Sequence, residues 1–194
     1  MITQKSQLRR QLRQRRAAIS IAQRQSAAWV ITHYPQILQK LRRGKKIALY
    51  VPVGSEFPTW PLIFLALQRG CFVYLPIVPS SGRQLRFVRL DQNSRWQLGA
   101  FNIPIPQHPE QCSAKDLDSV FVPLVGFDTT LARLGQGGGF YDTTFAFRRT
   151  RKSWLKPRLI GLAFACQQVD ALPSEPWDLQ LDAIATELAW LRRL

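Results

Sequence analysis

Two adjoining stretches, Ser119-Val-Phe-Val-Pro-Leu-Val-Gly-Phe127 and Arg133-Leu-Gly-Gln-Gly-Gly-Gly-Phe-Tyr-Asp142, decide the fold of this chain. The first is apolar throughout, which is typical of a buried strand, and the second is a glycine loop that ends in an aromatic pair. This order predicts a strand, a loop almost without side chains and the start of a helix. Backbone N–H groups in such a loop can converge on an anion, and phosphate is the obvious one.

Charged residues flank the glycine loop. Arg133 enters it and Asp142 leaves it, which provides a cation for phosphoryl oxygens and an oxygen ligand for the magnesium ion that accompanies a nucleotide. The two better-known phosphate loops fit poorly, because Phe140 stands where they need a lysine or a further glycine. A glycine cluster also serves ordinary tight turns, so a purely structural loop stays open as the alternative. The flanking charges favour another kind of polyphosphate site.

Length and composition predict one globular domain over residues 1–194. Apolar residues make up 46% of the chain and charged residues 20%, with no long low-complexity tract. No apolar run reaches the roughly 18 residues that span a bilayer, and the arginine-rich start lacks the apolar core of a secretory signal. Three cysteines at wide spacing match neither a disulfide framework nor a zinc site. We therefore expect a cytoplasmic protein without a membrane partner.

Basic residues gather at the start of a chain whose net charge is +15, and residues 1–16 hold six of them and no acid. A helix capped by Thr3 would carry a basic stripe beside an apolar stripe. The basic stripe is Lys5, Arg9, Arg13 and Arg16, and the apolar stripe is Leu8, Leu12 and Ile19. Because like charges four residues apart weaken an isolated helix, an anion beside the basic stripe would explain it best. A solvated basic face stays open as the alternative.

The same charge makes nucleic-acid binding an alternative class, because lysine and arginine supply most of the non-specific affinity for nucleic-acid phosphates. Against it, the sequence holds no RNA-recognition aromatic motif, zinc-finger spacing or helix-turn-helix pattern. The glycine loop would also have no role. We therefore expect no specific nucleic-acid partner.

Helical and strand patterns alternate along the chain, which predicts an α/β fold, a three-layer α/β/α domain with a largely parallel sheet. After the basic helix we expect helices at residues 21–43, interrupted near Pro35, at 61–69 and at 141–148. Strands are expected at residues 47–51, 72–76, 85–90, 119–127 and 159–164. Residues 92–117, which are rich in proline, are expected to be mainly loop.

Ligands of such sheets gather outside the carboxyl ends of the strands. Glu56 follows the strand at 47–51, the glycine loop follows the strand at 119–127, and Asp182 comes after the strand at 159–164 and its loop. We expect all three to face one cleft. Ordinary solvated acids stay open as the alternative for Glu56 and Asp182.

Several stretches together resemble a known family, in order and in spacing. They are Lys5–Arg9, Tyr50–Thr59, Val122–Asp128, Arg133–Asp142, Leu172–Asp178 and Leu181–Glu187. These stretches are similar to those of 5-formyltetrahydrofolate cyclo-ligases, also called methenyltetrahydrofolate synthetases. The resemblance covers nearly the whole chain, and the glycine motif is its most specific part.

The resemblance implies a single α/β domain that uses ATP and Mg²⁺ to convert a reduced folate, 5-formyltetrahydrofolate, to 5,10-methenyltetrahydrofolate, ADP and phosphate. In the family's mechanism the formyl oxygen takes the γ-phosphoryl group, N10 attacks the activated carbon, and phosphate leaves. The protein has to supply positioning and charge stabilisation. A kinase acting on another small acceptor would use the same residues, so the choice of substrate depends on the resemblance.

The resemblance also implies roles for individual residues. ATP would be bound by Lys5, Ser6, Gln7, Leu8, Arg9, Arg133, Leu134, Gly135, Gln136, Gly137, Gly138, Gly139, Phe140 and Tyr141. The folate would be bound by Val51, Glu56, Gln136, Gly137, Gly138, Gly139 and Phe140. Arg133 would be the catalytic residue that stabilises the transferring group, and Asp142 and Asp182 would bind Mg²⁺. Two positions depart from the family's usual pattern, Thr143 in place of a basic residue and Ile105 in place of a polar one.

Overall fold

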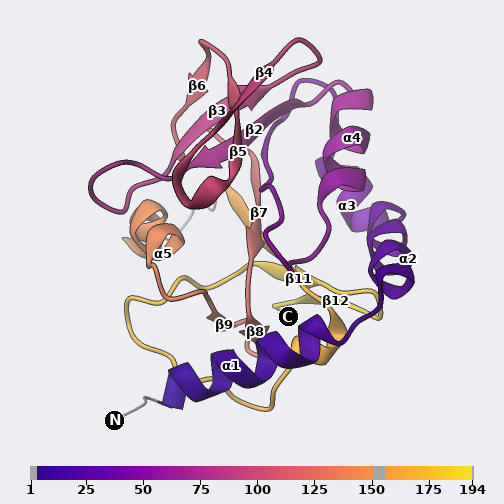
Figure 1. The fold of residues 1–194 in the computed structure, drawn as a ribbon, viewed down its shortest axis with the longest axis vertical. Helices are drawn as coiled ribbons and strands as arrows, with labels where there is room; N and C mark the ends of the chain where they lie inside the picture. The colour runs from indigo at the N-terminus through magenta and orange to yellow at the C-terminus, as the bar shows by residue number, and fades with distance from the viewer. Residues whose placement is uncertain (1–3, 151–155, 194) are drawn as a thin grey trace.

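The computed structural model describes residues 4–150 and 156–193 and is built on an eight-stranded sheet in the order β12-β11-β10-β7-β1-β2-β3-β6. Its five central strands, from β11 to β2, are mutually parallel, whereas β12, β3 and β6 are antiparallel to their neighbours. Strands β1, β2 and β3, from the first half of the chain, lie between β7 and β6, from the second half (Figure 1). Both halves of the chain thus contribute to one sheet, and a single domain over residues 1–194 stays a prediction.

The elements have the following bounds. The main sheet contains β1 (Lys46–Ala48), β2 (Phe72–Ile77), β3 (Arg86–Leu90), β6 (Gln111–Cys112), β7 (Ser119–Pro123), β10 (Arg158–Leu162), β11 (Ala183–Ala185) and β12 (Trp190–Arg192). Two ribbons pair β4 (Arg95–Leu98) with β5 (Pro104–Gln107) and β8 (Gly126–Phe127) with β9 (Arg133–Leu134). The helices are α1 (Gln4–Ala17), α2 (Ile21–Thr32), α3 (Pro35–Lys40), α4 (Trp60–Gln68) and α5 (Phe140–Thr144), with short 3₁₀ helices at Ala100–Asn102, Ala146–Thr150 and Ala165–Gln167.

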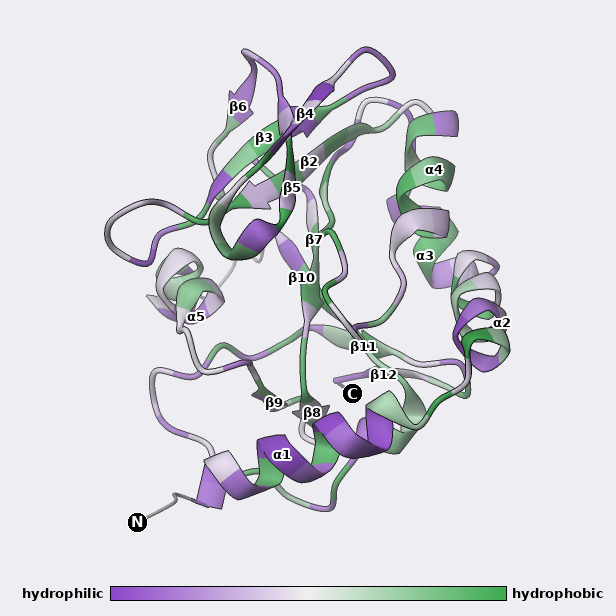
Figure 2. Ribbon diagram, in the orientation of Figure 1, coloured by the Kyte–Doolittle hydropathy of each residue, from purple (hydrophilic) through white to green (hydrophobic). Residues whose placement is uncertain are grey.

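Strand β7 occupies the centre of the sheet, as its continuous apolar sequence predicts. It pairs in parallel with β1 on one side and β10 on the other. Val120, Phe121 and Val122 are each at most 1% exposed, because their side chains alternate between two covered faces. Figure 2 shows the same pattern, with apolar residues along the inner strands and polar residues on the outer surfaces.

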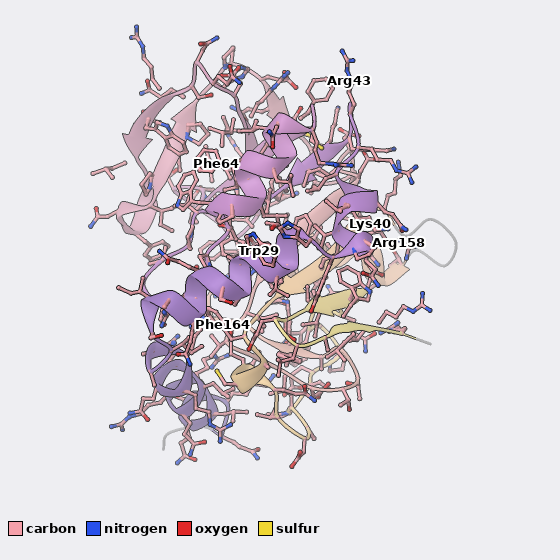
Figure 3. The ribbon with its side chains drawn as sticks, turned by 90° about the vertical axis from the view of Figure 1, so that its right-hand side faces the viewer. Trp29, Lys40, Arg43, Phe64, Arg158 and Phe164 are labelled. Carbon is pink, nitrogen blue, oxygen red and sulfur yellow. The ribbon has the colours of Figure 1, made fainter. Side chains whose placement is uncertain are left out.

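Helices α2, α3 and α4 cover one face of the sheet, and Figure 3 shows α2 and α4 in front of the strands. The opposite face is covered by α5, the 3₁₀ helix at Ala146–Thr150 and well-packed loops, with Phe145 fully buried. The α/β fold with a largely parallel sheet is therefore confirmed. The second covering layer contains much less helix than the first.

The predicted interruption of the second helix is present. Helix α2 begins at a capping box formed by Ser20 and Gln23, and α3 begins at Pro35, whose fixed φ suits the first helical position. The cap expected at Thr3 lies outside the described residues. The helix expected at 61–69 corresponds to α4, and the one expected at 141–148 divides into α5 and a 3₁₀ helix.

The expectation that residues 92–117 are mainly loop missed the β4–β5 hairpin and the short strand β6, which lie within this stretch. Pro104 and Pro106 are compatible with a strand because they lie two residues apart. Their nitrogens therefore face the same edge of β5, away from β4, where no hydrogen bond to the partner strand is needed. Strands β11 and β12 were also not expected. No helix in the described part of the chain is long and apolar enough to cross a membrane.

Candidate active site

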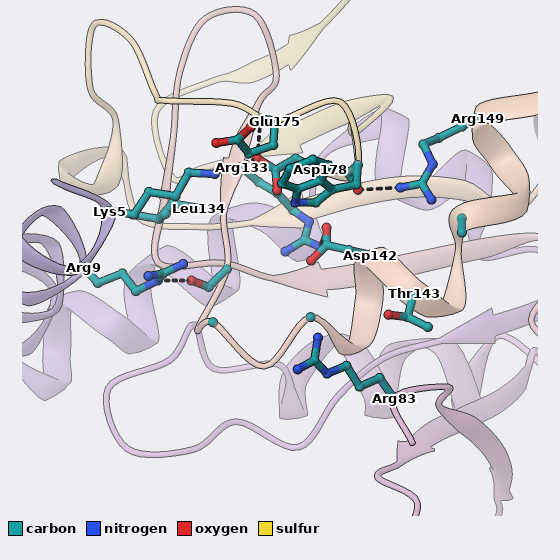
Figure 4. A pocket seen from close by; sticks show the side chains of 15 residues that line it. Lys5, Arg9, Arg83, Arg133, Leu134, Asp142, Thr143, Arg149, Glu175 and Asp178 are labelled. Atoms are coloured by element: carbon teal, nitrogen blue, oxygen red, sulfur yellow. Dashed lines mark hydrogen bonds and ion pairs between the residues drawn. The ribbon is translucent and has the colours of Figure 1, made fainter. Parts of the chain in front are cut away.

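A pocket of about 610 Å³ opens where the glycine loop meets α1 and the segment before β11. Figure 4 shows its charged side chains converging from these different parts of the chain. Five cations and three acids line it, namely Lys5, Arg9, Arg83, Arg133, Arg149, Asp142, Glu175 and Asp178. The pocket is therefore cationic, as an anion site requires.

The glycine loop lies between the β8–β9 ribbon and α5. Gly137 and Gly139 have φ values of +105° and +71°, which residues with a Cβ rarely adopt. Gly138 is needed for another reason, since a Cβ atom there would lie 2.7 Å from the Phe140 ring. Phe140 then begins α5, so the predicted order of strand, loop and helix is confirmed.

Arg133 is the buried centre of the pocket, with a side chain only 3% exposed. Its Nη2 donates to Asp142 Oδ1 at 2.7 Å, and its guanidinium lies over the Tyr141 ring. Its Nε, which is fully buried, has no hydrogen-bond partner within the described part of the chain. Burial raises the pKa of Tyr141, so the Tyr141 hydroxyl stays neutral beside the cation. Arg133 thus retains a donor that the protein does not satisfy.

Helix α1 holds its basic residues against the pocket. Leu12 is fully buried beside Val125 and Leu134, and Leu8 packs against the same cluster. This contact turns Arg9 toward the glycine loop, where its Nε donates to Gly135 O at 2.8 Å. Arg9 therefore lies against the glycine loop, and an anion beside the basic stripe stays a prediction.

The other polar residues of α1 differ in what they contact. Lys5 lines the pocket and forms an ion pair with Asp178 at 3.0 Å. Ser6 and Gln7 are exposed on α1 and do not belong to the pocket lining. Arg16 is buried and binds Ser55 Oγ and Leu124 O, so it ties α1 to the loop that carries Glu56.

Glu56 joins the glycine loop, as expected from its position after β1. Gln136 Nε2 donates to Glu56 Oε1 at 3.0 Å, and Arg13 donates to Gln136 Oε1 at 2.6 Å. The backbone N–H of Val53 holds the second oxygen of Glu56. Val51 lies half-buried at the start of the same loop. The structure therefore brings Glu56 and Gln136 together, whereas Val51 packs against the core cluster beneath α2 and α4.

The structure does not bring Asp182 to this pocket. Asp182 precedes β11, and its Oδ2 accepts a hydrogen bond from the backbone N–H of Leu159, at the amino end of β10. Its two oxygens also bind Arg148 at 2.7 and 2.9 Å. The structure therefore does not place the three in one cleft. The glycine loop lines the pocket, Glu56 contacts that loop through Gln136 without lining the pocket, and Asp182 lies at the amino ends of β10 and β11.

Asp178 is the acid that accompanies Asp142. Both line the pocket, and Asp142 Oδ1 accepts from the backbone N–H of Leu179, the residue that follows Asp178. Within the described residues, no group of three or more His, Cys, Asp or Glu side chains is arranged to hold a metal. A magnesium ion here would need further oxygens, which phosphate groups and water can supply.

Sequence reasoning missed Asp178, Glu175, Trp177, Arg149 and Arg83 as pocket residues. For the first three a signal was present, because the stretch Leu172–Asp178 was recognised as part of the family resemblance without being assigned a role. Arg149 lies in the 3₁₀ helix after α5 and donates to Trp177 O. Arg83 lies between β2 and β3, and no local pattern marks it.

These features describe an α/β protein with a cationic pocket at a glycine loop. A family model described as the 5-formyltetrahydrofolate cyclo-ligase family matches residues 1–187. This chain belongs to that family.

Relatives and solved structures agree with this assignment. The chain is 37% identical to the 5-formyltetrahydrofolate cyclo-ligase of Haemophilus influenzae over 187 residues, 93% of this chain and 97% of the relative. It is 34% identical to the Escherichia coli K12 enzyme over 188 residues, 90% of this chain and 96% of the relative. The NMR structure of Aquifex aeolicus 5,10-methenyltetrahydrofolate synthetase is similar with a TM-score of 0.79 and 28% identity, over 98% of this chain and 93% of that one.

Proposed function

We propose that the glycine-loop pocket carries out the family's reaction, the ATP-dependent conversion of 5-formyltetrahydrofolate to 5,10-methenyltetrahydrofolate with release of ADP and phosphate. The observation that carries the proposal is Arg133. Its guanidinium is buried at the glycine loop, binds Asp142 through one nitrogen and keeps its Nε without a protein partner. A phosphoryl group is an acceptor that matches this arrangement.

ATP would lie along the glycine loop, with Arg9 and Lys5 at its phosphates. Both side chains already reach the pocket, and Leu12 fixes the helix that carries them. Arg133 would bind the phosphoryl group during its transfer from ATP to the formyl oxygen. Its positive charge would stabilise the negative charge on the phosphoryl oxygens in the transition state. The basic residues of the loop and of α1 together would form one phosphate clamp.

Magnesium would be held by Asp142 and Asp178 together with phosphate oxygens. Carboxylates are the ligands that Mg²⁺ prefers, and these two side chains line the same pocket. They are at present neutralised by Arg133 and Lys5, which phosphates could bind in their place. When bound, the ion would supply charge neutralisation of the phosphates. We replace the expected ligand Asp182 by Asp178 because Arg148 and the Leu159 amide occupy the carboxylate of Asp182.

The folate would lie on the other side of the glycine loop, against Glu56, Val51 and Phe140. The Glu56 carboxylate can accept hydrogen bonds from the pterin amino and ring N–H groups. The formyl oxygen would then attack the γ-phosphorus and ADP would leave. N10 would next attack the activated carbon and lose its proton, and the C–O bond would break to release phosphate. The protein orients the two substrates across the glycine loop.

The test is the near-ultraviolet absorbance of the methenyl product after mixing the protein with 5-formyltetrahydrofolate, Mg²⁺ and ATP. We expect absorbance to rise with ATP and to stay constant without it. No rise from folded protein would reject the proposal. The cytoplasmic location and the absence of a specific nucleic-acid partner stay predictions.

A further inference from the structure

Arg83 lines the pocket from an element that the family resemblance does not include. It lies on the loop that joins β2 to β3, which extends beside α5 in Figure 1. In Figure 4 its side chain points toward the glycine loop from the side away from Arg133 and Lys5. Arg83 therefore adds a positive charge to a wall of the pocket that α1 does not reach.

Three arginines stand against alternate glycines of the loop. A Cβ atom on Gly135 would lie 2.7 Å from Arg133 Nη1, and one on Gly139 would lie 3.5 Å from Arg83 Nη1. Between them, a Cβ atom on Gly137 would lie 3.6 Å from Arg9 Cζ. The missing side chains thus leave room for guanidinium groups from β9, from α1 and from the β2–β3 loop. Arg133 and Arg9 belong to the proposed ATP clamp. Arg83 lies against a glycine of the loop in the same way.

Arg83 differs from the other pocket cations in having no partner among the described residues. Lys5, Arg9, Arg133 and Arg149 each bind an oxygen atom of the protein. Arg83 makes no hydrogen bond or ion pair with any residue that the structure describes. Its donors can therefore bind a ligand without first breaking a protein contact.

We propose that Arg83 binds the γ-phosphoryl group of ATP at the folate end of the glycine loop, an inference that rests on the proposed function. Gly139, which Arg83 approaches, adjoins Phe140. The proposed function places Phe140 against the folate. The phosphoryl group that passes from ATP to the formyl oxygen has to lie between the nucleotide and the folate. Arg83 and Arg133 would then hold this group from two sides.

The experiment compares the dissociation constants of MgATP and MgADP, measured by calorimetry, for the wild-type protein and for Arg83→Ala. Arg86→Ala is the matched control, because Arg86 is also exposed, lies three residues further on and does not line the pocket. We expect Arg83→Ala to weaken MgATP about tenfold, the effect of one charge-assisted contact, and to change MgADP less than about twofold. Arg86→Ala should change neither.

Two results would overturn the inference. Equal weakening of MgATP and MgADP would place Arg83 away from the γ-phosphoryl group. Equal weakening of MgATP binding by Arg83→Ala and Arg86→Ala would show that the effect comes from the overall positive charge of the surface and not from a contact of Arg83. A wild-type protein that binds neither nucleotide would instead reject the proposed function itself, so the two failures are distinguishable.

Discussion

The molecule contains two buried arginine–aspartate pairs, Arg133–Asp142 at the glycine loop and Arg148–Asp182 at the amino ends of β10 and β11. They are similar in burial, since the arginine side chains are 3% and 9% exposed and the aspartates 26% and 17%. They differ in the number of hydrogen bonds that the arginine and the aspartate make. Arg133 binds its aspartate through one nitrogen, whereas Arg148 binds both oxygens of Asp182 and also Pro157 O.

The comparison distinguishes a candidate ligand site, at Arg133 and Asp142, from a structural ion pair, formed by Arg148 and Asp182. Asp182 accepts further hydrogen bonds from the Leu159 amide, so its carboxylate has little capacity left for a metal or substrate. Arg133 and Asp142 face a pocket, and a phosphate could replace their single mutual contact. Burial and charge alone do not distinguish the two pairs. The Nε atoms do not distinguish them either, because Arg133 Nε and Arg148 Nε are both buried and lack a hydrogen-bond partner within the described residues. The two pairs differ in the number of hydrogen bonds between arginine and aspartate and in the pocket that Arg133 and Asp142 line.

The largest expected effect is that of Arg133→Ala on turnover. Removal of a buried group that stabilises charge in the transition state is expected to lower kcat about 100- to 1,000-fold. The urea midpoint should change little, because Asp142 keeps the hydrogen bond from the Leu179 amide and access to water. Steady-state kinetics and urea unfolding measure the two quantities. Near-normal turnover would remove Arg133 from the mechanism.

The opposite result is expected for Arg148→Ala. Removal of this arginine leaves the mostly buried Asp182 carboxylate without its main cation, which is expected to cost about 3 kcal/mol of unfolding free energy. Turnover per folded molecule should stay close to wild type, because Arg148 does not line the pocket. Urea unfolding and kinetics at low temperature check both statements. A fall in kcat with unchanged stability would contradict the structural assignment of this pair.

The two aspartates provide the third comparison, through the dependence of turnover on magnesium. Asp178→Asn should raise the Mg²⁺ concentration needed for half-maximal turnover about tenfold, because it removes one charged ligand. Asp182→Asn should leave that concentration unchanged and lower the urea midpoint. Titration of Mg²⁺ at saturating ATP decides between the two acids, and the reverse result would restore Asp182 as the metal ligand.

Local sequence was enough to predict the glycine loop, Arg133 and Glu56, because each follows a recognisable strand within a few residues. It was not enough for Asp182. Only three residues separate it from Asp178, yet Asp178 lines the pocket whereas Asp182 lies just before β11 and binds the amino end of β10. Which acid reaches the pocket depends on where β11 begins, and three apolar residues do not mark that start clearly.

The β4–β5 hairpin and Arg83 could not be predicted for a related reason. Proline content indicated a loop at Asn102–Pro106, whereas the strand forms because its two prolines face the same edge. Arg83 enters the pocket only because the antiparallel pairing of β2 and β3 returns the chain toward α5. Both features depend on tertiary arrangement and not on local pattern.

The smallest expected effect concerns Asp118, a third carboxylate satisfied by the protein. Burial alone would raise the pKa of Asp118, but hydrogen bonds from Lys156, the Lys46 amide and Lys45 outweigh it and hold the pKa below its ordinary value. A lowered pKa in the folded state means that this stabilisation is present above the ordinary carboxyl pKa. It is lost as the pH falls through the folded-state value.

Urea midpoints measured from neutral to acidic pH for the wild type and Asp118→Asn test this statement. The wild type should be more stable at neutral pH, by about 1 kcal/mol for a partly exposed cluster of charges, and the difference should shrink in acid. Turnover at neutral pH should be equal in the two proteins, because Asp118 lies at the amino edge of β7 and does not line the pocket. Because Asn cannot titrate, a difference that stays constant with pH would show that the Asp118 charge contributes nothing. Turnover of Asp142→Asn should instead fall at neutral pH, because the proposed function assigns the Asp142 carboxylate to Mg²⁺, whereas the Asp118 carboxylate binds Lys45, Lys46 and Lys156.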